Sequence, residues 1–185
     1  MSIPGEIRPV RTAVVGCGAI SGIYLENISS RFRILELAGV CDLNREAAEA
    51  ASRKHGVPVL TMEQILADPG IEMVINLTAP GAHYGVIRTL LEGGKHVYTE
   101  KVLCPDFAQA KELVRLADEK GLTLCAAPDT FLGAAFQTAR FAVDSGLIGE
   151  PTSCVAVLQR DAWNLAEKFP FTTRPGGGIG IDVAI

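Results

Sequence analysis

The sequence has no excess of basic residues, no signal-peptide pattern in its first twelve residues and no long apolar run. Its formal charge is −4 over 185 residues, and its pI is about 5.4. A nucleic-acid partner is not expected, because such binding depends on surplus Lys and Arg that release counterions from phosphates. Residues 1–12 contain no apolar core of a signal peptide, and no stretch is long enough to span a membrane. These absences favour a cytoplasmic protein with no membrane partner.

Closely spaced cysteines, internal repeats and low-complexity tracts are also lacking. None of the five cysteines has the spacing of a metal site or of a Cys-x-x-Cys motif; they are Cys17, Cys41, Cys104, Cys125 and Cys154. We expect reduced cysteines that act as small hydrophobic residues, and no metal site.

The sequence does contain enough apolar material for a core, with 48% hydrophobic and 21% charged residues. Short apolar runs alternate with longer segments of helical period, which is typical of βαβ units around a parallel sheet. The expected strands are 11–16, 35–41, 58–60, 73–77, 96–99 and 122–126. The expected helices are 19–29, 45–55, 62–67, 82–92 and 107–120. The predicted fold class is α/β, a Rossmann-type doubly wound parallel sheet followed by the start of a second, α+β substrate domain.

Local signals support two of these helices. Asn44 and Asp106 precede helical segments and have side chains suited to cap them. In the helix that follows Asp106, the pattern predicts an apolar face made by Phe107, Ala110, Val114 and Ala117.

The chain is expected to divide near residue 128. Residues 1–127 form the predicted dinucleotide-binding domain, and residues 128–185 the incomplete start of a substrate or oligomerisation domain. In this second part the pattern predicts a helix over 130–144 and an alternating strand over 153–159. One helix and one strand cannot bury both faces of a separate sheet, so the second domain is expected to be incomplete.

A glycine-rich turn follows the first expected strand. Residues 16–21 match Gly-x-Gly-x-x-small, with Ser21 where a third glycine is commoner. Gly16 allows the tight turn, and Gly18 lets the backbone approach a pyrophosphate at the helix N-terminus. Ala19 and Ile20 complete the predicted cofactor-binding turn. An ordinary glycine-rich strand–helix turn is the alternative, and the strand-helix-acid context disfavours it.

Asp42 follows the second expected strand, 21 residues after Ser21. A carboxylate there can accept hydrogen bonds from the adenosine ribose hydroxyls and repel a 2′-phosphate, so NAD is expected rather than NADP. Arg45 weakens this discrimination, because its charge can offset that of a phosphate. A solvated loop aspartate is the alternative interpretation.

Four further stretches extend the pattern: residues 76–83, 94–101, 129–133 and the glycine run 176–182 that ends at Asp182. Together with Gly-Cys-Gly-Ala-Ile-Ser at the start, they resemble the glucose–fructose oxidoreductase, inositol dehydrogenase and MocA (Gfo/Idh/MocA) family of sugar and polyol dehydrogenases. The resemblance covers nearly the whole chain, from about Thr12 to Asp182.

The resemblance implies roles for particular residues. It places Thr78, Pro80 and His83 in a loop that packs along the cofactor, although a satisfied loop or helix-start histidine is an alternative for His83. Glu100 corresponds to the family glutamate that contacts the nicotinamide ribose, and Lys101 to the lysine that reaches the substrate hydroxyl. Lys101 and Asp182, which matches the aspartate of the family's Asp-x-x-x-His (or Tyr) motif, are the predicted catalytic residues.

Two departures from the family pattern affect these roles. Val102 stands where the family has proline, whose peptide bond is commonly cis. A cis bond before another residue costs roughly 2.5–4 kcal/mol, so either a trans bond or a strained one is expected. The His or Tyr four residues after Asp182 would lie beyond Ile185. We therefore expect NAD binding with little or no dehydrogenase activity from these 185 residues, and robust turnover of a sugar or polyol would contradict this.

The sequence pattern is compatible with three functions. The favoured one is the NAD-binding part of a sugar or polyol dehydrogenase that transfers hydride between a carbinol carbon and nicotinamide. The second is a non-catalytic, dinucleotide-binding regulatory or sensor protein. Val102 and the missing His or Tyr favour it, and the retained Lys101 and Asp182 disfavour it. The third, an aldehyde or amino-acid-pathway dehydrogenase, is disfavoured by the Glu-Lys stretch and the closing glycine run.

The expected partners are a small sugar or polyol substrate and further copies of the protein. The resemblance implies a homo-oligomer formed through the sheet of a complete second domain. The expected strand 153–159 carries apolar residues near an edge, and such edges invite pairing with another chain.

Overall fold

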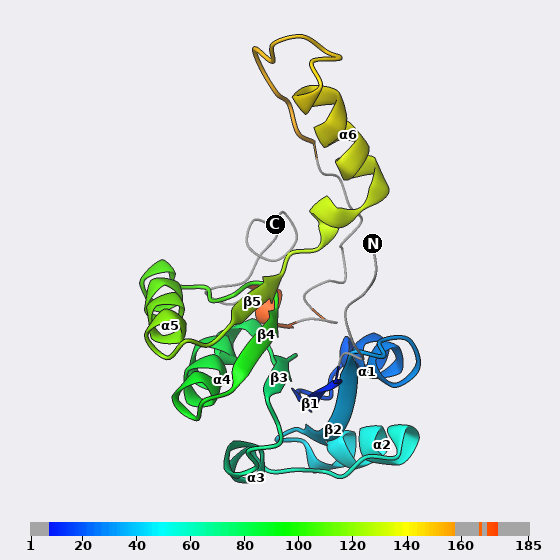
Figure 1. The fold of residues 1–185 in the computed structure, drawn as a ribbon, viewed down its shortest axis with the longest axis vertical. Helices are drawn as coiled ribbons and strands as arrows, with labels where there is room; N and C mark the ends of the chain where they lie inside the picture. The colour runs from blue at the N-terminus through cyan, green and yellow to red at the C-terminus, as the bar shows by residue number, and fades with distance from the viewer. Residues whose placement is uncertain (1–7, 158–166, 168–169, 174–185) are drawn as a thin grey trace.

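The computed structural model of the protein describes residues 8–157, 167 and 170–173. Its centre is a five-stranded, wholly parallel sheet in the order β2-β1-β3-β4-β5 (Figure 1). The strands are β1 (Val10–Val15), β2 (Leu35–Cys41), β3 (Met73–Asn76), β4 (His96–Glu100) and β5 (Leu124–Ala127). Beyond β2, Val59 forms an isolated parallel bridge with Val40. The expected strand 58–60 is therefore reduced to this single bridge. The predicted Rossmann-type fold is confirmed.

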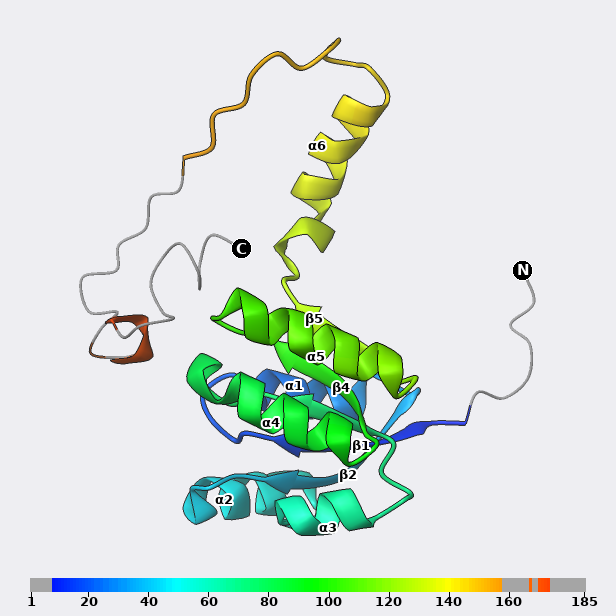
Figure 2. The ribbon, with the colours of Figure 1, turned by 90° about the vertical axis from the view of Figure 1, so that its left-hand side faces the viewer.

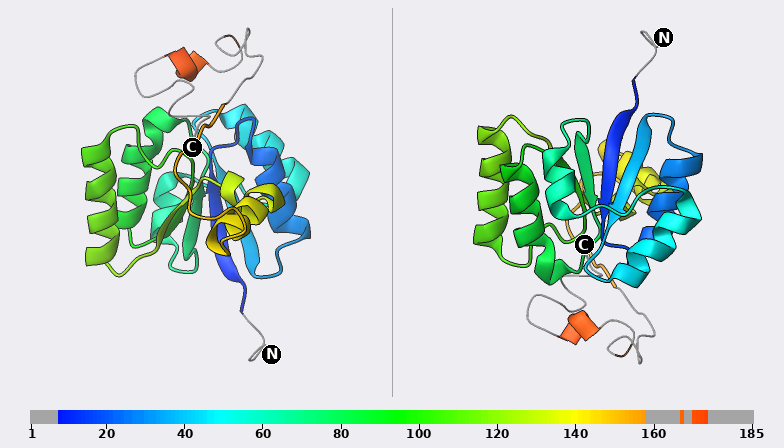
Figure 3. Two further views of the ribbon diagram at one scale, coloured as in Figure 1. Left: turned by 90° about the horizontal axis from the view of Figure 1, so that it is seen from above. Right: turned by 90° about the horizontal axis from the view of Figure 1, so that it is seen from below.

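Helices connect each strand to the next. They are α1 (Ser21–Ser30), α2 (Arg45–His55), α3 (Met62–Ala67), α4 (Pro80–Glu92) and α5 (Phe107–Glu119). Figure 2 shows α4 and α5 stacked side by side, and Figure 3 shows them on the opposite side of the molecule from α1 and α2. None of the helices in the described part of the chain is both long and apolar enough to cross a membrane.

Alternating strand residues divide the core into two clusters. Ala13, Val15, Val74 and Val97 point to one face of the sheet, where they pack against Ile87, Leu90 and Leu91 of α4 and Leu113 of α5. Val14, Val40 and Ile75 point to the other face, where they pack against Leu25 and Ile28 of α1. A parallel sheet with both faces covered needs such continuous apolar strands, and this explains the short apolar runs of the sequence.

Both expected caps are present. The side chain of Asn44 accepts from the Ala47 N–H at 3.2 Å, and that of Asp106 from the Gln109 N–H at 2.8 Å. The expected apolar face of α5 is wrong in part, because Phe107 and Val114 are exposed and Leu113 and Ala117 are the buried residues. The Phe107 ring instead lies under the Lys111 ammonium.

The region after β5 departs from the prediction. The expected helix 130–144 is divided into a 3₁₀ turn (Thr130–Leu132) and α6 (Ala134–Asp144), which projects away from the sheet with no buried residue (Figure 1). Residues 153–157 form no strand, so the predicted strand is wrong over its described part. A single segment with no neighbouring strand cannot make ladder hydrogen bonds. Residues 158 and 159 lie outside the described residues.

Candidate dinucleotide-binding crevice

The carboxyl ends of the parallel strands meet at one edge of the sheet. The chain runs from β1 to its neighbour β2, and it then crosses to β3 on the opposite side of β1. This reversal is a topological switch point, where open α/β sheets leave a crevice for a ligand. The loops after β1, β2, β3 and β4 all lie at this edge, so most of the predicted site residues come together here.

The glycine turn after β1 is packed tightly between the ends of its two neighbouring strands, β2 and β3. Gly16 has φ = +101°, and a Cβ atom on it would lie 2.6 Å from the backbone carbon of Leu77. Its N–H donates to the Cys41 carbonyl at 2.8 Å. A side chain cannot be accommodated at Gly16, because the obstructing atoms belong to the backbone.

Gly18 differs from Gly16, because beyond its two chain neighbours no described atom lies within 4 Å of the position its Cβ would take. The open space lies at the start of α1, with the exposed Ala19 and Ile20 beside it. Among the described residues, no side chain caps this helix, and its first turn contains no acidic residue. The helix N-terminus therefore offers N–H groups and a positive dipole end to an anion.

The Asp42 carboxylate lies directly beside the glycine turn. Its Oδ2 accepts from the Cys17 N–H at 2.6 Å, and its Oδ1 accepts from the Asn44 N–H at 2.6 Å. Each oxygen retains a further lone pair, so the two bonds orient the carboxylate and still allow it to accept from a ligand hydroxyl. The guanidinium of Arg45 pairs with Glu49 at 2.8 Å on the exposed side of α2.

The two cysteines beside Asp42 remain protonated thiols at neutral pH. Burial, followed by the nearby charge of Asp42, raises the pKa of Cys17 to about 11. Burial also raises the pKa of Cys41, with Asp42 again contributing. All five cysteines are reduced. Cys104 is buried, as expected of a small hydrophobic residue, whereas Cys125 and Cys154 are exposed and do not fit that expectation.

A buried amide connects the ends of β3 and β4. The Asn76 side chain donates to the Thr99 hydroxyl at 2.9 Å, and its Oδ1 accepts from the Thr78 hydroxyl at 2.7 Å. Asn76 and Thr99 are fully buried, and Thr78 is half-buried in the loop before α4. Pro80 begins α4, where its missing N–H costs no helical hydrogen bond. The network fixes the position of the Thr78 loop at the crevice.

His83 is completely buried, and both of its ring nitrogens face carbonyl oxygens. Nδ1 lies 2.6 Å from the Val102 carbonyl oxygen, and Nε2 lies 2.8 Å from that of Thr78. A buried ring cannot touch a ligand directly in this conformation. His83 instead joins the loop after β3 to the loop after β4, so its influence on a cofactor passes through these two loops.

Glu100 and Lys101 end β4 at the crevice. Glu100 Oε1 accepts from the Tyr24 hydroxyl at 2.7 Å, and Oε2 accepts from the Lys101 N–H at 3.0 Å. The peptide bond between Lys101 and Val102 is cis. Sequence reasoning did not single out Tyr24, since no local pattern connects a residue of α1 with the end of a strand 76 positions further on. The other predicted catalytic residue, Asp182, lies outside the described residues.

Other features of the described residues do not add to the crevice. No group of three or more His, Cys, Asp and Glu side chains in the described ranges could hold a metal ion. A hollow of about 390 Å³ lies at the opposite edge of the sheet, between Leu66, Pro69, Lys95 and His96. It is remote from the glycine turn, and the crevice remains the candidate site.

The fold and the crevice define the dinucleotide-binding domain of an α/β oxidoreductase. Residues 10–127 match the sequence model of the Gfo/Idh/MocA oxidoreductase family, described as having an NAD-binding Rossmann fold. The chain belongs to this family, and the expected resemblance is confirmed.

Three relatives illustrate the match. The scyllo-inositol 2-dehydrogenase (NAD⁺) of Bacillus subtilis is 28% identical over 178 residues, which are 95% of this chain and 51% of that protein. The WlbA dehydrogenase of Bordetella pertussis, solved with NADH and UDP-GlcNAcA, is 28% identical with a TM-score of 0.72, over 77% of this chain and 42% of that one. An oxidoreductase from Desulfitobacterium hafniense named as NADPH-dependent shares the fold, at 23% identity and a TM-score of 0.72 over 78% of this chain and 42% of that one. The chain spans about half the length of the curated relatives it matches.

Proposed function

We propose that this chain carries the coenzyme-binding part of an NAD-dependent sugar or polyol dehydrogenase. The observation that carries the proposal is the combination of an open backbone turn at Gly18 with the fixed Asp42 carboxylate beside it. The turn and the α1 N-terminus bind the pyrophosphate, and Asp42 accepts from the adenosine ribose hydroxyls. The inositol dehydrogenase and the sugar-nucleotide dehydrogenase among the relatives support a polyhydroxylated substrate.

The residues at the end of β4 belong to the reacting half of the proposed site. Bound NAD would supply the nicotinamide carbon that accepts hydride from the carbinol carbon. The Glu100 carboxylate accepts from the ribose hydroxyls next to the nicotinamide. The Lys101 ammonium donates to the substrate oxygen, and it stabilises the negative charge that develops when the hydroxyl proton leaves. Asp182 is proposed as its partner in proton transfer.

We also propose that the 185 residues bind coenzyme far better than they turn over substrate. Oxidation of a carbinol needs a base that titrates near neutral pH, for which histidine is best suited. Among the described residues His83 is the histidine beside the crevice, and both its ring nitrogens already face carbonyl oxygens. It is therefore not available to accept the substrate proton.

The choice of NAD over NADP rests on Asp42. A 2′-phosphate would lie next to its carboxylate and be repelled. The Arg45 guanidinium, which could offset that charge, is directed to Glu49. This exposed ion pair is weak, so Arg45 can turn toward a phosphate and reduce the preference, whereas the fixed Asp42 carboxylate maintains it.

Replacing Asp42 by alanine tests this proposal. D42A should weaken NAD⁺ binding about tenfold, because the charge-assisted bonds to two ribose hydroxyls are lost. The affinity for NADP⁺ should rise or stay the same, since the repulsion is lost as well. Isothermal calorimetry with both coenzymes measures the two dissociation constants, and Asp118→Ala on the exposed side of α5 is the matched control. No heat from the unaltered chain with NAD⁺, or an unchanged preference in D42A, would overturn the proposal.

A further inference from the structure

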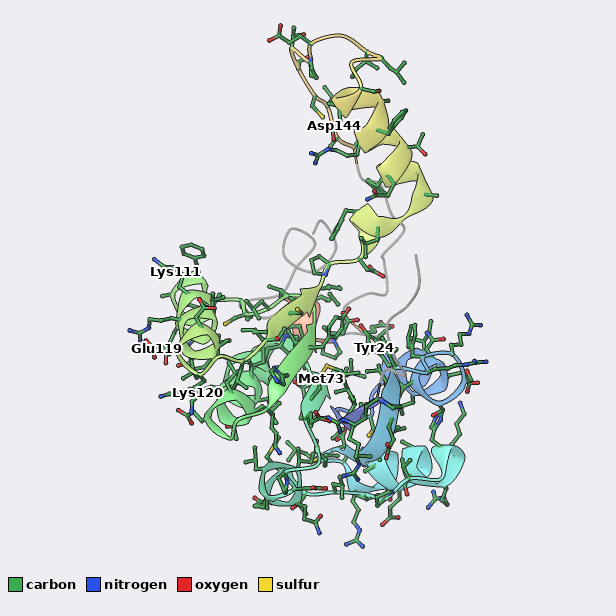
Figure 4. The ribbon with its side chains drawn as sticks, viewed as in Figure 1. Tyr24, Met73, Lys111, Glu119, Lys120 and Asp144 are labelled. Carbon is green, nitrogen blue, oxygen red and sulfur yellow. The ribbon has the colours of Figure 1, made fainter. Side chains whose placement is uncertain are left out.

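Tyr24 connects the phosphate-binding helix with the reacting end of the crevice. It lies on α1, one turn after the glycine turn, on the side of the helix that faces the sheet (Figure 4). Its hydroxyl donates to Glu100 Oε1 at 2.7 Å, although the two residues are 76 positions apart. The strand β3 lies between β1, which precedes α1, and β4, which ends in Glu100. The bond therefore crosses the switch point of the sheet.

The surroundings keep Tyr24 in the form that donates this bond. Its ring packs with Tyr98 against the cluster of Val14, Leu25 and Ile75. Burial, followed by the hydrogen bond to Glu100, raises the pKa of Tyr24 well above its usual range. Burial and the charge of Glu100 raise the pKa of Tyr98 as well. The Tyr24 phenol is consequently neutral, and able to donate, at neutral pH.

The carboxylate of Glu100 is held from two sides. Tyr24 binds one oxygen, and the backbone N–H of Lys101 binds the other. The N–H belongs to the adjacent residue, so it cannot by itself choose among the rotamers of a glutamate that has several freely rotating bonds. The Tyr24 hydroxyl comes from another element and selects one of them. Each carboxylate oxygen keeps a lone pair for a ligand hydroxyl.

We propose that Tyr24 is a positioning residue of the coenzyme site, which holds Glu100 ready to accept the hydroxyls of the ribose next to the nicotinamide. This inference rests on the proposed function, because it assumes that a dinucleotide occupies the crevice. Tyr24 acts before the ligand arrives: the ordering of the glutamate side chain is completed during folding, and binding does not have to supply it. Tyr24 thus affects the nicotinamide half of the ligand and leaves the adenosine half unchanged.

The test compares two ligands that differ in that half. NADH contains both riboses, whereas ADP contains the adenosine and the diphosphate but not the nicotinamide ribose. Tyr24→Phe should weaken NADH binding about fivefold in calorimetry, the effect of one hydrogen bond, and should leave ADP binding unchanged. Tyr84→Phe is the matched control, because the Tyr84 hydroxyl makes a comparable bond, at 2.9 Å, to Glu112 between α4 and α5. Y84F should change neither affinity.

A double-mutant cycle tests whether Tyr24 affects NADH binding through Glu100. Glu100→Gln should weaken NADH binding by itself, and adding Y24F to E100Q should cause little further loss if Tyr24 acts through Glu100. Unchanged NADH binding in Y24F, equal losses for NADH and ADP, or fully additive losses in the double variant would each overturn the inference. If the unaltered chain binds neither ligand, the proposed function itself fails, and this outcome is distinct from all three.

Discussion

Alanine at Gly16 should destabilise the domain by about 3–5 kcal/mol, a large part of the stability of any small domain. Gly16 has φ = +101°, a conformation that alanine rarely adopts, and the new Cβ would lie 2.6 Å from the Leu77 carbon and 2.7 Å from its oxygen. Those atoms belong to the chain that leaves β3, so the strand itself would have to shift. Urea denaturation followed by circular dichroism measures the change in free energy of unfolding.

Alanine at Gly18 should leave the free energy of unfolding nearly unchanged and should weaken NAD⁺ binding. Beyond the two adjacent residues, no described atom lies within 4 Å of the added Cβ, so the stability of G18A should stay close to that of the original chain. The methyl group would stand where the diphosphate approaches the backbone, and NAD⁺ binding should weaken at least about tenfold. Gly85→Ala in α4, which also has an open Cβ position, is the control that should leave NAD⁺ binding intact.

Comparison of G16A with G18A distinguishes a glycine required by the fold from a glycine required for binding of the diphosphate. A stable G16A variant would show that the turn after β1 is not constrained as described. A G18A variant with full affinity for NAD⁺ would show that the anion is bound elsewhere. Calorimetry and denaturation on the same preparations distinguish these results, since G18A is expected to lose NAD⁺ affinity while it keeps its stability, and G16A is expected to lose stability.

The elements that the sequence predicted well are those determined by local chemistry. Asn44 and Asp106 cap their helices as expected, because a cap depends on only three or four neighbouring residues. The five paired strands were recognisable from apolar runs, since a buried parallel strand is apolar on both faces. The glycine turn and Asp42 lie beside each other, which follows from two adjacent strands ending at the same edge.

The predictions that failed depend on contacts between distant segments. The pattern of α5 allowed two apolar faces, and packing against α4 buries Leu113 and Ala117 while Phe107 stays exposed. The alternating residues 153–157 could form a strand only beside another strand, and they have no such neighbour among the described residues. The contact of Tyr24 with Glu100 likewise depends on the folded arrangement of three strands.

His83 shows how family resemblance and structure complement each other. The resemblance associated it with the cofactor loop, and a satisfied loop or helix-start histidine was the alternative. Its ring is fully buried, and it faces the carbonyl oxygens of Thr78 and Val102. A role at the cofactor remains a prediction, and the geometry directs it through the two loops, because the ring itself has no surface to offer a ligand.

Replacing His83 by alanine should destabilise the domain by about 3–4 kcal/mol. The change would leave a cavity in the position of the ring and would remove the donor that two loop carbonyls share. His55 at the end of α2 is only partly buried, and His55→Ala should change the free energy of unfolding by no more than about 0.5 kcal/mol. Parallel urea titrations of the two variants measure the difference.

The effect of H83A should extend to the coenzyme, because the two loops that the ring joins both border the crevice. One loop carries Thr78, whose hydroxyl donates to the Asn76 side chain, and the other loop follows Glu100 and Lys101. Once the connection is lost, Thr78 retains its bond to Asn76, whereas the loop after β4 loses the side-chain bond to its Val102 carbonyl. NAD⁺ binding should therefore weaken in H83A more than ADP binding, under conditions in which the variant is still folded. An H83A variant with the original urea midpoint would show that the buried ring does not hold these loops together.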